Sequence, residues 1–183
     1  MMATKETIMK RGLAGLILLV LMLGAGLAAA AAATAKVKIG VYDSRGVAVA
    51  YARSAEFQQS MAQLMADHAK AKGAKDEKRL RELEQQGQWT QVRLHQRGFS
   101  TAGAADLLAK FRDALPGIAR EAGVTLIVSK WEMPFSDPSV ETIDLTEPLA
   151  RLFQPDAATL KLLEDLKNSP PVPFDELSLD PNS

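Results

Sequence analysis

The sequence contains no cysteine and only two histidines, His68 and His95. The lack of cysteine excludes disulfides, a thiol nucleophile, cysteine-ligated metals and a lipid-modified N-terminal cysteine. Two histidines alone do not build a typical transition-metal site, so we expect no metal and no cofactor. We place His68 in a core or interface between helices and His95 on a basic, solvated helix face.

The sequence also lacks a histidine positioned to form a catalytic triad. Asp43, Ser129 and Asp144 stand at the ends of predicted strands, where catalytic residues can lie. Three such residues occur by chance in most small domains of this kind. We therefore predict a protein that is not an enzyme, in which Asp43, Asp144 and Thr146 are structural: Asp144 orients a loop and Thr146 caps a helix.

Neither sign of charge is in excess over the whole chain, which has 22 basic and 22 acidic residues. Residues 36–130, however, carry 16 basic and 10 acidic residues, whereas residues 131–183 carry 3 basic and 11 acidic ones. Such a split can orient subunits or attract charged partners, and the alternative is that these charges lie on solvated helix faces. A basic cluster in the first of these ranges is not interleaved with aromatic residues, so we expect no nucleic-acid binding. Its members are Lys70, Lys72, Lys75, Lys78, Arg79 and Arg81.

Residues 1–35 have the order of a secretory signal: a short basic region, an apolar stretch and a segment of small residues. Lys5, Lys10 and Arg11 are followed by a strongly apolar stretch of about 11 residues, and Ala33-Thr34-Ala35 fits a cleavage site before Lys36. We therefore expect export to the periplasm. The alternative is an uncleaved membrane anchor, since the uncharged stretch 12–35 exceeds the roughly 18 residues that can span a bilayer.

The rest of the chain predicts an α+β fold with a small β-sheet body of three strands and a long helical hairpin-like insertion between the first two strands. Alternation and β-branched residues predict the strands, and apolar residues at helical spacing predict the helices. We expect a single domain over 36–167 and a disordered, proline-rich acidic tail over 168–183. The elements expected within the domain are a strand at 37–44, a helical arm at 47–122, strands at 124–129 and 140–145, and helices over 146–167.

The helical arm is predicted to consist of helices over 47–72, 75–97 and 102–122, with breaks at Gly73, Gly87 and Gly98. Pro116 should kink the last of these or divide it at Ala114–Leu115, and Gly123 should end it. The middle helix is dense in charge with a thin apolar seam, which suits a helical hairpin or a coiled coil better than a globular core. Because a helix of about 22 residues is roughly 33 Å long, the arm should be short.

Two stretches of the chain have a recognisable arrangement of strand and cap residues. The first is Lys36–Ser44, where an exported chain starts directly with a strand of the form K-I-x-V-x-D-S. The second is Leu115–Phe153, where a helix ending in I-A-R-E-A-G precedes the strand V-T-L-I-V-S-K, a loop, and an I-D-L-T element at Ile143–Thr146. In these two stretches the chain resembles the Skp/OmpH-like family of periplasmic chaperones. The C-terminal extension from Gln154 onward goes beyond the usual end of that family.

The resemblance implies a homo-oligomer, a trimer, whose strands form a central body and whose helical arms surround a cavity that holds unfolded outer-membrane proteins. The arm residues expected to contact clients, or anionic membrane surfaces in the case of the basic ones, are Phe57, Met61, Met65, Lys72, Lys75, Lys78 and Arg79. The alternative for Phe57, Met61 and Met65 is a purely structural role, in which they pack between helices. The alternative function is a membrane-tethered structural or adaptor protein of the envelope, with no client holding.

Overall fold

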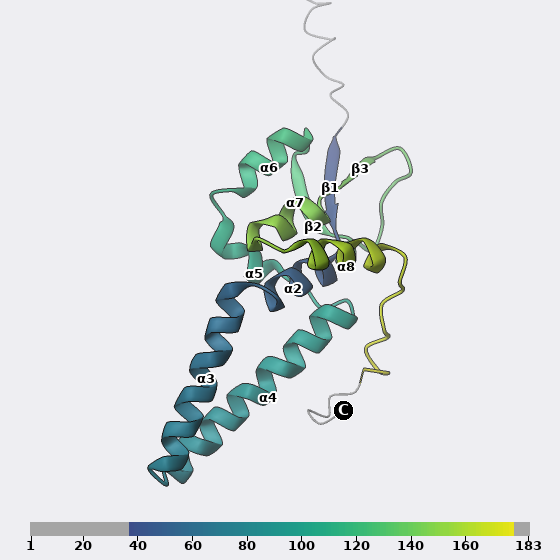
Figure 1. Cartoon of the computed structure of the whole chain (residues 1–183). Helices are drawn as coiled ribbons and strands as arrows, with labels where there is room; N and C mark the ends of the chain where they lie inside the picture. The colour runs from purple at the N-terminus through teal and green to yellow at the C-terminus, as the bar shows by residue number, and fades with distance from the viewer. Residues whose placement is uncertain (1–36, 178–183) are drawn as a thin grey trace, which may run out of the picture. The chain divides into compact units, whose positions relative to one another are not determined.

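The computed structural model describes residues 37–177, so the predicted signal segment 1–35 lies outside the described residues. Figure 1 shows the arrangement of the elements. In chain order they are β1 (Lys38–Tyr42), α2 (Ser44–Ala52), α3 (Ala55–Gly73), α4 (Glu77–Phe99), α5 (Ala105–Leu108), η2 (Ala109–Phe111), α6 (Leu115–Ala122), β2 (Leu126–Ser129), β3 (Glu141–Asp144), α7 (Thr146–Ala150), η3 (Arg151–Phe153) and α8 (Ala157–Lys167).

The three strands form one parallel sheet in the order β2-β1-β3. Ile39 of the central strand pairs with Leu126 on one side and with Thr142 on the other. Parallel neighbours need a crossover connection, and the first crossover is the helical segment that the sequence predicts between the first two strands. The α+β fold with a small three-stranded body and a helical insertion is therefore confirmed.

Helix α2 lies at the centre of the body, where it contacts α4, α7 and α8. Val47 and Ala50 of this helix have no exposed surface, and Ala48 has almost none. Their small side chains let the neighbouring helices approach closely. The sheet packs on the same core: a Cβ atom at Gly40 would come within 2.4 Å of Leu145 Cδ1, so only glycine leaves room for the residue that leads into α7.

Helices α3 and α4 pack against each other as a hairpin that projects from the body (Figure 1), and we call this hairpin the arm. The side chain of Ser54 accepts a hydrogen bond from Phe57 N and starts α3, and Asp76 starts α4 in the same way by accepting from Arg79 N. Lys75, between the two helices, has the left-handed backbone conformation that the tight turn requires (φ 56°). At 23 residues α4 is roughly 35 Å long.

Two expectations about the arm were wrong. The helix predicted over 47–72 is divided near Ser54, because this residue caps a new helix, and its first part, α2, belongs to the buried body. The predicted breaks at Gly87 and Gly98 do not occur, since α4 continues through both. Glycine weakens a helix by only about 1 kcal/mol relative to alanine, and packing against α3 and the body outweighs this cost.

The segment predicted as a helix over 102–122 is divided, as its proline indicates. Pro116 occupies the first turn of α6, where its missing N–H costs nothing. Gly123 ends this helix with a left-handed backbone (φ 66°), and its N–H donates to Ala119 O and Arg120 O. The first half of the segment is the short helix α5 and the 3-10 turn η2.

Candidate binding surfaces

A buried ion pair lies where β1 ends. The Asp43 side chain accepts a hydrogen bond from Arg45 N and so caps α2. The same carboxylate pairs with the Arg45 guanidinium at 2.7 Å between Nη2 and Oδ2, and the two side chains are 2% (Arg45) and 7% (Asp43) exposed. A buried charge without a partner costs several kcal/mol, so each member of the pair requires the other.

The turn that follows β2 supplies further partners for Asp43. Lys130 Nζ lies 2.8 Å from Oδ2, and Trp131 Nε1 donates to Oδ1 at 3.1 Å. Burial by itself would raise the pKa of Asp43, but the hydrogen bonds from Arg45, Lys130 and Trp131 outweigh it and lower this pKa from 3.8 to about 2. Both carboxylate oxygens are thus engaged by donors from α2 and from the turn after β2.

Arg45 extends this network to the end of α8. Its Nη2 donates to Leu166 O at 3.1 Å, and its Nη1 donates to Ser169 O at 2.9 Å. The last carbonyls of a helix lack partners within the helix and attract cations. One buried arginine therefore holds the end of α8 and the start of the segment after it, which the sequence predicts to be a disordered tail.

The prediction that Thr146 caps α7 was wrong. The N-cap position is Leu145, and no side chain makes a capping bond there. Instead Thr146 Oγ1 accepts from Asp43 N at 2.9 Å, and Asp144 Oδ1 accepts from Thr146 N at 2.8 Å. The hydroxyl joins β1 to α7 because parallel strands bring their carboxyl ends to the same edge of the sheet.

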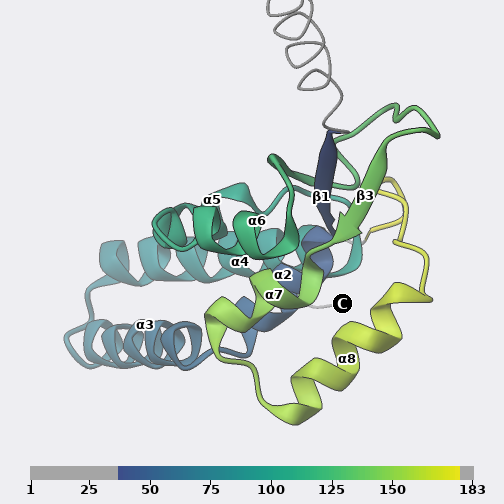
Figure 2. The same ribbon diagram turned by 90° about the horizontal axis from the view of Figure 1, so that it is seen from above.

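The two faces of the sheet differ in how they are covered. Tyr42, Ile127 and Ile143 on one face pack into the core with α7. Ile39, Val41 and Val128 alternate with them, so they lie on the opposite face and outside the core cluster, as does Leu126, which is 52% exposed. Figure 2 shows β1 beside β3, with α7 following the end of β3.

The predicted client-contact residues lie in two parts of the arm. Phe57 is buried at its base, with its ring edge-on to Tyr51 at 5.2 Å between centroids. Met61 is half-buried and Met65 is 69% exposed. The basic residues are all exposed at the tip of the arm: Lys72, Lys75, Lys78 and Arg79.

Sequence reasoning missed Trp89, which lies on α4 and is 65% exposed. In the sequence, the charged pattern of this helix is interrupted by a thin apolar seam, and the prediction for α4 rested on that seam. Leu83 is the one residue of α4 that is buried. Of the two positions expected for His68, a core or an interface, the structure has the second: its Nε2 lies 3.5 Å from Glu84 Oε1, so it links the two arm helices at their surface. A large exposed aromatic residue on a helix is the signal that points to Trp89.

An aromatic cluster holds the base of the arm against the body. Tyr51 of α2 meets Phe153 at 5.8 Å between ring centroids, and Phe153 meets Phe111 at 5.0 Å. Lys110 lies over all three rings and pairs with Glu56 in the first turn of α3. Cation–π contacts of this kind stabilise the contact by about 0.5–1 kcal/mol each at exposed sites.

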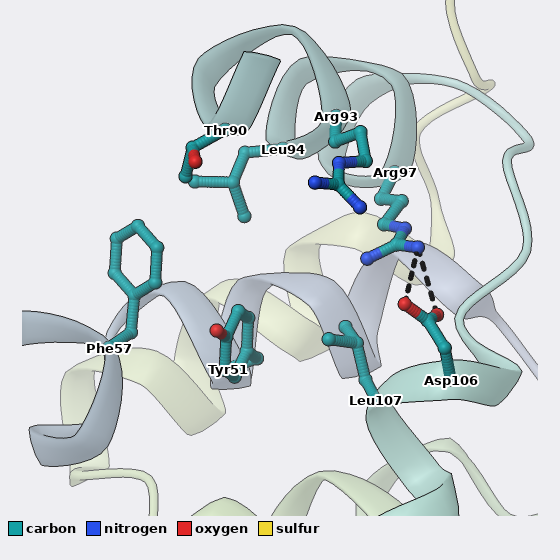
Figure 3. A pocket seen from close by; sticks show the side chains of 8 residues that line it. All are labelled: Tyr51, Phe57, Thr90, Arg93, Leu94, Arg97, Asp106 and Leu107. Carbon is teal, nitrogen blue, oxygen red and sulfur yellow. Dashed lines mark hydrogen bonds and ion pairs between the residues drawn. The ribbon is translucent and has the colours of Figure 1, made fainter. Parts of the chain in front are cut away.

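A pocket of about 170 Å³ opens beside this cluster (Figure 3). Helix α4 lines one wall with Thr90, Arg93, Leu94 and Arg97. The opposite wall consists of Tyr51, Phe57, Asp106 and Leu107. The spacing of the α4 residues puts them on one helix face. We call this cavity the arm-base pocket.

Two arginines in the arm-base pocket differ in their partners. Arg97 Nη2 lies 2.8 Å from both carboxylate oxygens of Asp106, and its side chain is 16% exposed. Arg93 is exposed to solvent and makes no hydrogen bond or ion pair within residues 37–177. Figure 3 shows its guanidinium beside that of Arg97, facing the pocket. Arg93 is therefore a solvent-exposed positive charge at the pocket that has no acidic partner among the described residues.

No group of residues in the described part of the chain is arranged to hold a metal ion. None of the helices described in residues 37–177 is long and apolar enough to cross a membrane. No protein-family model, curated protein or solved structure matches this chain.

Proposed function

We propose that this chain is an exported, non-enzymatic binding protein that assembles through its sheet and holds unfolded or envelope proteins with its helical arm. The observation that carries the proposal is the exposure of the arm. Across the 19 residues of α3 and the 23 of α4, only Phe57, Ala71 and Leu83 are buried. A hairpin that adds so little to the core is a surface for contacts, and Met65 and Trp89 give it adaptable apolar groups.

The outward face of the sheet supports assembly into a homo-oligomer, for which we propose a trimer. Parallel sheets normally have both faces covered, because their crossover connections place helices on the faces. Here one face carries Leu126 with half of its surface exposed, and Val37 just before β1 is 59% exposed. Strands β2 and β3 are also edges of the sheet, with backbone groups free for pairing.

Light scattering on a size-exclusion column tests the assembly. We expect a trimer at micromolar concentration, and Leu126→Lys should shift it toward monomer because a charge would then lie in the interface. The matched control is Leu162→Lys on α8, where the leucine is 41% exposed on a helix. A monomeric wild-type protein, or equal effects of the two substitutions, would contradict assembly through the sheet.

Aggregation of an unfolded outer-membrane β-barrel protein tests client holding. We expect suppression at molar excess, with a several-fold loss for Met65→Ser combined with Trp89→Ser. Phe174→Ser is the control, because this exposed aromatic lies outside the arm. Failure to suppress aggregation at any excess would rule out holding.

Mass spectrometry of the protein isolated from cells tests export. A mature chain beginning at Lys36 supports the periplasmic protein, and an intact leader instead supports the membrane-tethered adaptor.

A further inference from the structure

The arm-base pocket has the dimensions and chemistry of a site for one small ligand group. A cavity of about 150 Å³ lined by leucine, isoleucine and phenylalanine holds benzene, so the 170 Å³ here is enough for one phenyl ring or branched aliphatic group. Phe57 and Leu107 line it as buried apolar groups. Its lining residues come from α2, α3, α4 and α5, so the pocket forms where the base of the arm meets the body.

The charges of the pocket select the other part of the ligand. Asp106 engages Arg97 through both oxygens and holds it in place. Arg93 is left as a cation with its donors free in the described structure, and a guanidinium binds a carboxylate through two parallel hydrogen bonds. The ligand should therefore carry a negative charge a few ångströms from its apolar group.

The donors present favour a carboxylate over a phosphate. Thr90 Oγ1 already donates to Gln86 O at 2.8 Å, so it has no second proton for a ligand. A phosphate has three oxygens to satisfy, whereas one free guanidinium matches the two oxygens of a carboxylate. In the rest of the lining, Phe57, Leu94 and Leu107 are apolar and Arg97 is paired with Asp106, so the Tyr51 hydroxyl is the one further neutral polar group.

From this arrangement we infer that the arm-base pocket binds the carboxylate of an apolar acid, with Arg93 as the carboxylate partner and Phe57, Leu94 and Leu107 around the apolar group. Such a carboxylate has two sources: a free aromatic or branched aliphatic acid, or the C-terminal residue of a polypeptide ending in an apolar side chain. The site lies within one chain, so it depends neither on trimer formation nor on client holding.

Isothermal titration of the full-length protein with 3-phenylpropionate and with its amide tests the inference. The acid should bind at least tenfold more tightly than the amide, because only the acid pairs with Arg93. Arg93→Gln should weaken binding of the acid at least tenfold, whereas Arg112→Gln, an exposed arginine outside the pocket, should leave it unchanged. Equal affinities for acid and amide, or unchanged binding by Arg93→Gln, would overturn the inference.

A second titration separates the two sources. A short peptide ending in phenylalanine with a free C-terminus is compared with the same peptide amidated. Binding of the free peptide supports a polypeptide C-terminus, and binding of 3-phenylpropionate alone supports a small free acid. Absence of binding by both carboxylates overturns the proposal. These titrations need no client and no particular oligomer. The pocket can therefore fail to bind a carboxylate while the proposed function stands, and it can bind one while the proposed function fails.

Discussion

The body and the arm differ in the interactions that stabilise each of them. In the body, Val47, Ala50 and Leu149 have no exposed surface, and the Asp43–Arg45 ion pair is almost completely buried. The arm has a thin seam, and Met65 and Trp89 are more than 60% exposed. Substitutions in the body should therefore act on folding. Those on the arm should act on surface properties, with small effects on stability.

Asp43→Asn should have the largest effect. The substitution removes the charge that balances buried Arg45 and should lower the free energy of unfolding by about 3–5 kcal/mol. Urea denaturation followed by circular dichroism measures this change. Asp113→Asn is the matched control at an exposed position and should change stability by less than 0.5 kcal/mol. Similar losses for both variants would show that the buried pair is not special.

Acid should remove a smaller part of the same stabilisation. The pKa of Asp43 is about 2 in the folded protein against an ordinary 3.8, so the folded state favours the ionised form. This contribution, on the order of 2 kcal/mol, is complete above about pH 5 and is lost as the pH falls from about 4 to about 2. The stability difference between wild type and Asp43→Asn should narrow over that range. A difference that stays constant down to pH 2 would contradict the lowered pKa.

The same substitution at two glycines should have opposite effects in the two regions. A Cβ atom at Gly46 in the body would lie 2.5 Å from Thr146 Cγ2, so Gly46→Ala should cost about 1–3 kcal/mol. A Cβ atom at Gly87 in the arm would make an ordinary 3.8 Å contact with Leu64 Cδ2, so Gly87→Ala should stabilise the protein by about 0.5–1 kcal/mol. Thermal unfolding of both variants checks the signs, and a loss at Gly87 would mean that the arm is packed as tightly as the body.

Glu84→Gln should have the smallest effect. Glu84 pairs with His68 across the arm at 3.5 Å, and the side chains are 57% and 39% exposed. Exposed ion pairs contribute roughly 0–1 kcal/mol and are screened by salt. Chemical denaturation in low and high salt should show a change below about 0.5 kcal/mol that shrinks further in salt. A loss above 1 kcal/mol would place this pair among the contacts that determine the fold.

Local sequence patterns predicted the elements better than their boundaries. The three strands were found because alternation and β-branched residues act over a few neighbours, and the break before α6 was found because Pro116 fixes its own backbone. The division between α2 and α3 was missed, since Ser54 differs little from other serines until its hydroxyl receives Phe57 N. Gly87 and Gly98 were given too much weight, because the cost of a glycine is small beside helix packing.

The candidate sites show the same limit. Phe57 was expected to meet clients because it lies on an apolar stripe, but contacts with Tyr51 bury it at the base of the arm. The spacing of four residues in the sequence already places them on one helix face: Thr90, Arg93, Leu94 and Arg97. The pocket also needs Asp106 and Leu107, which come from a different helix, so the sequence pattern of α4 does not predict it.

The sequence alone established the absence of cysteine chemistry, the order of strands and helices, the split of charge and the export pattern of residues 1–35. All of these depend on composition or on residues close together in the chain. The tertiary structure decided which charges are buried and which are free. Asp43 and Arg45 are two residues apart, but their other partners lie at 130–131 and 166–169. Only folding brings such distant groups together, because long-range contacts are set by the packing of the whole body and not by any local pattern.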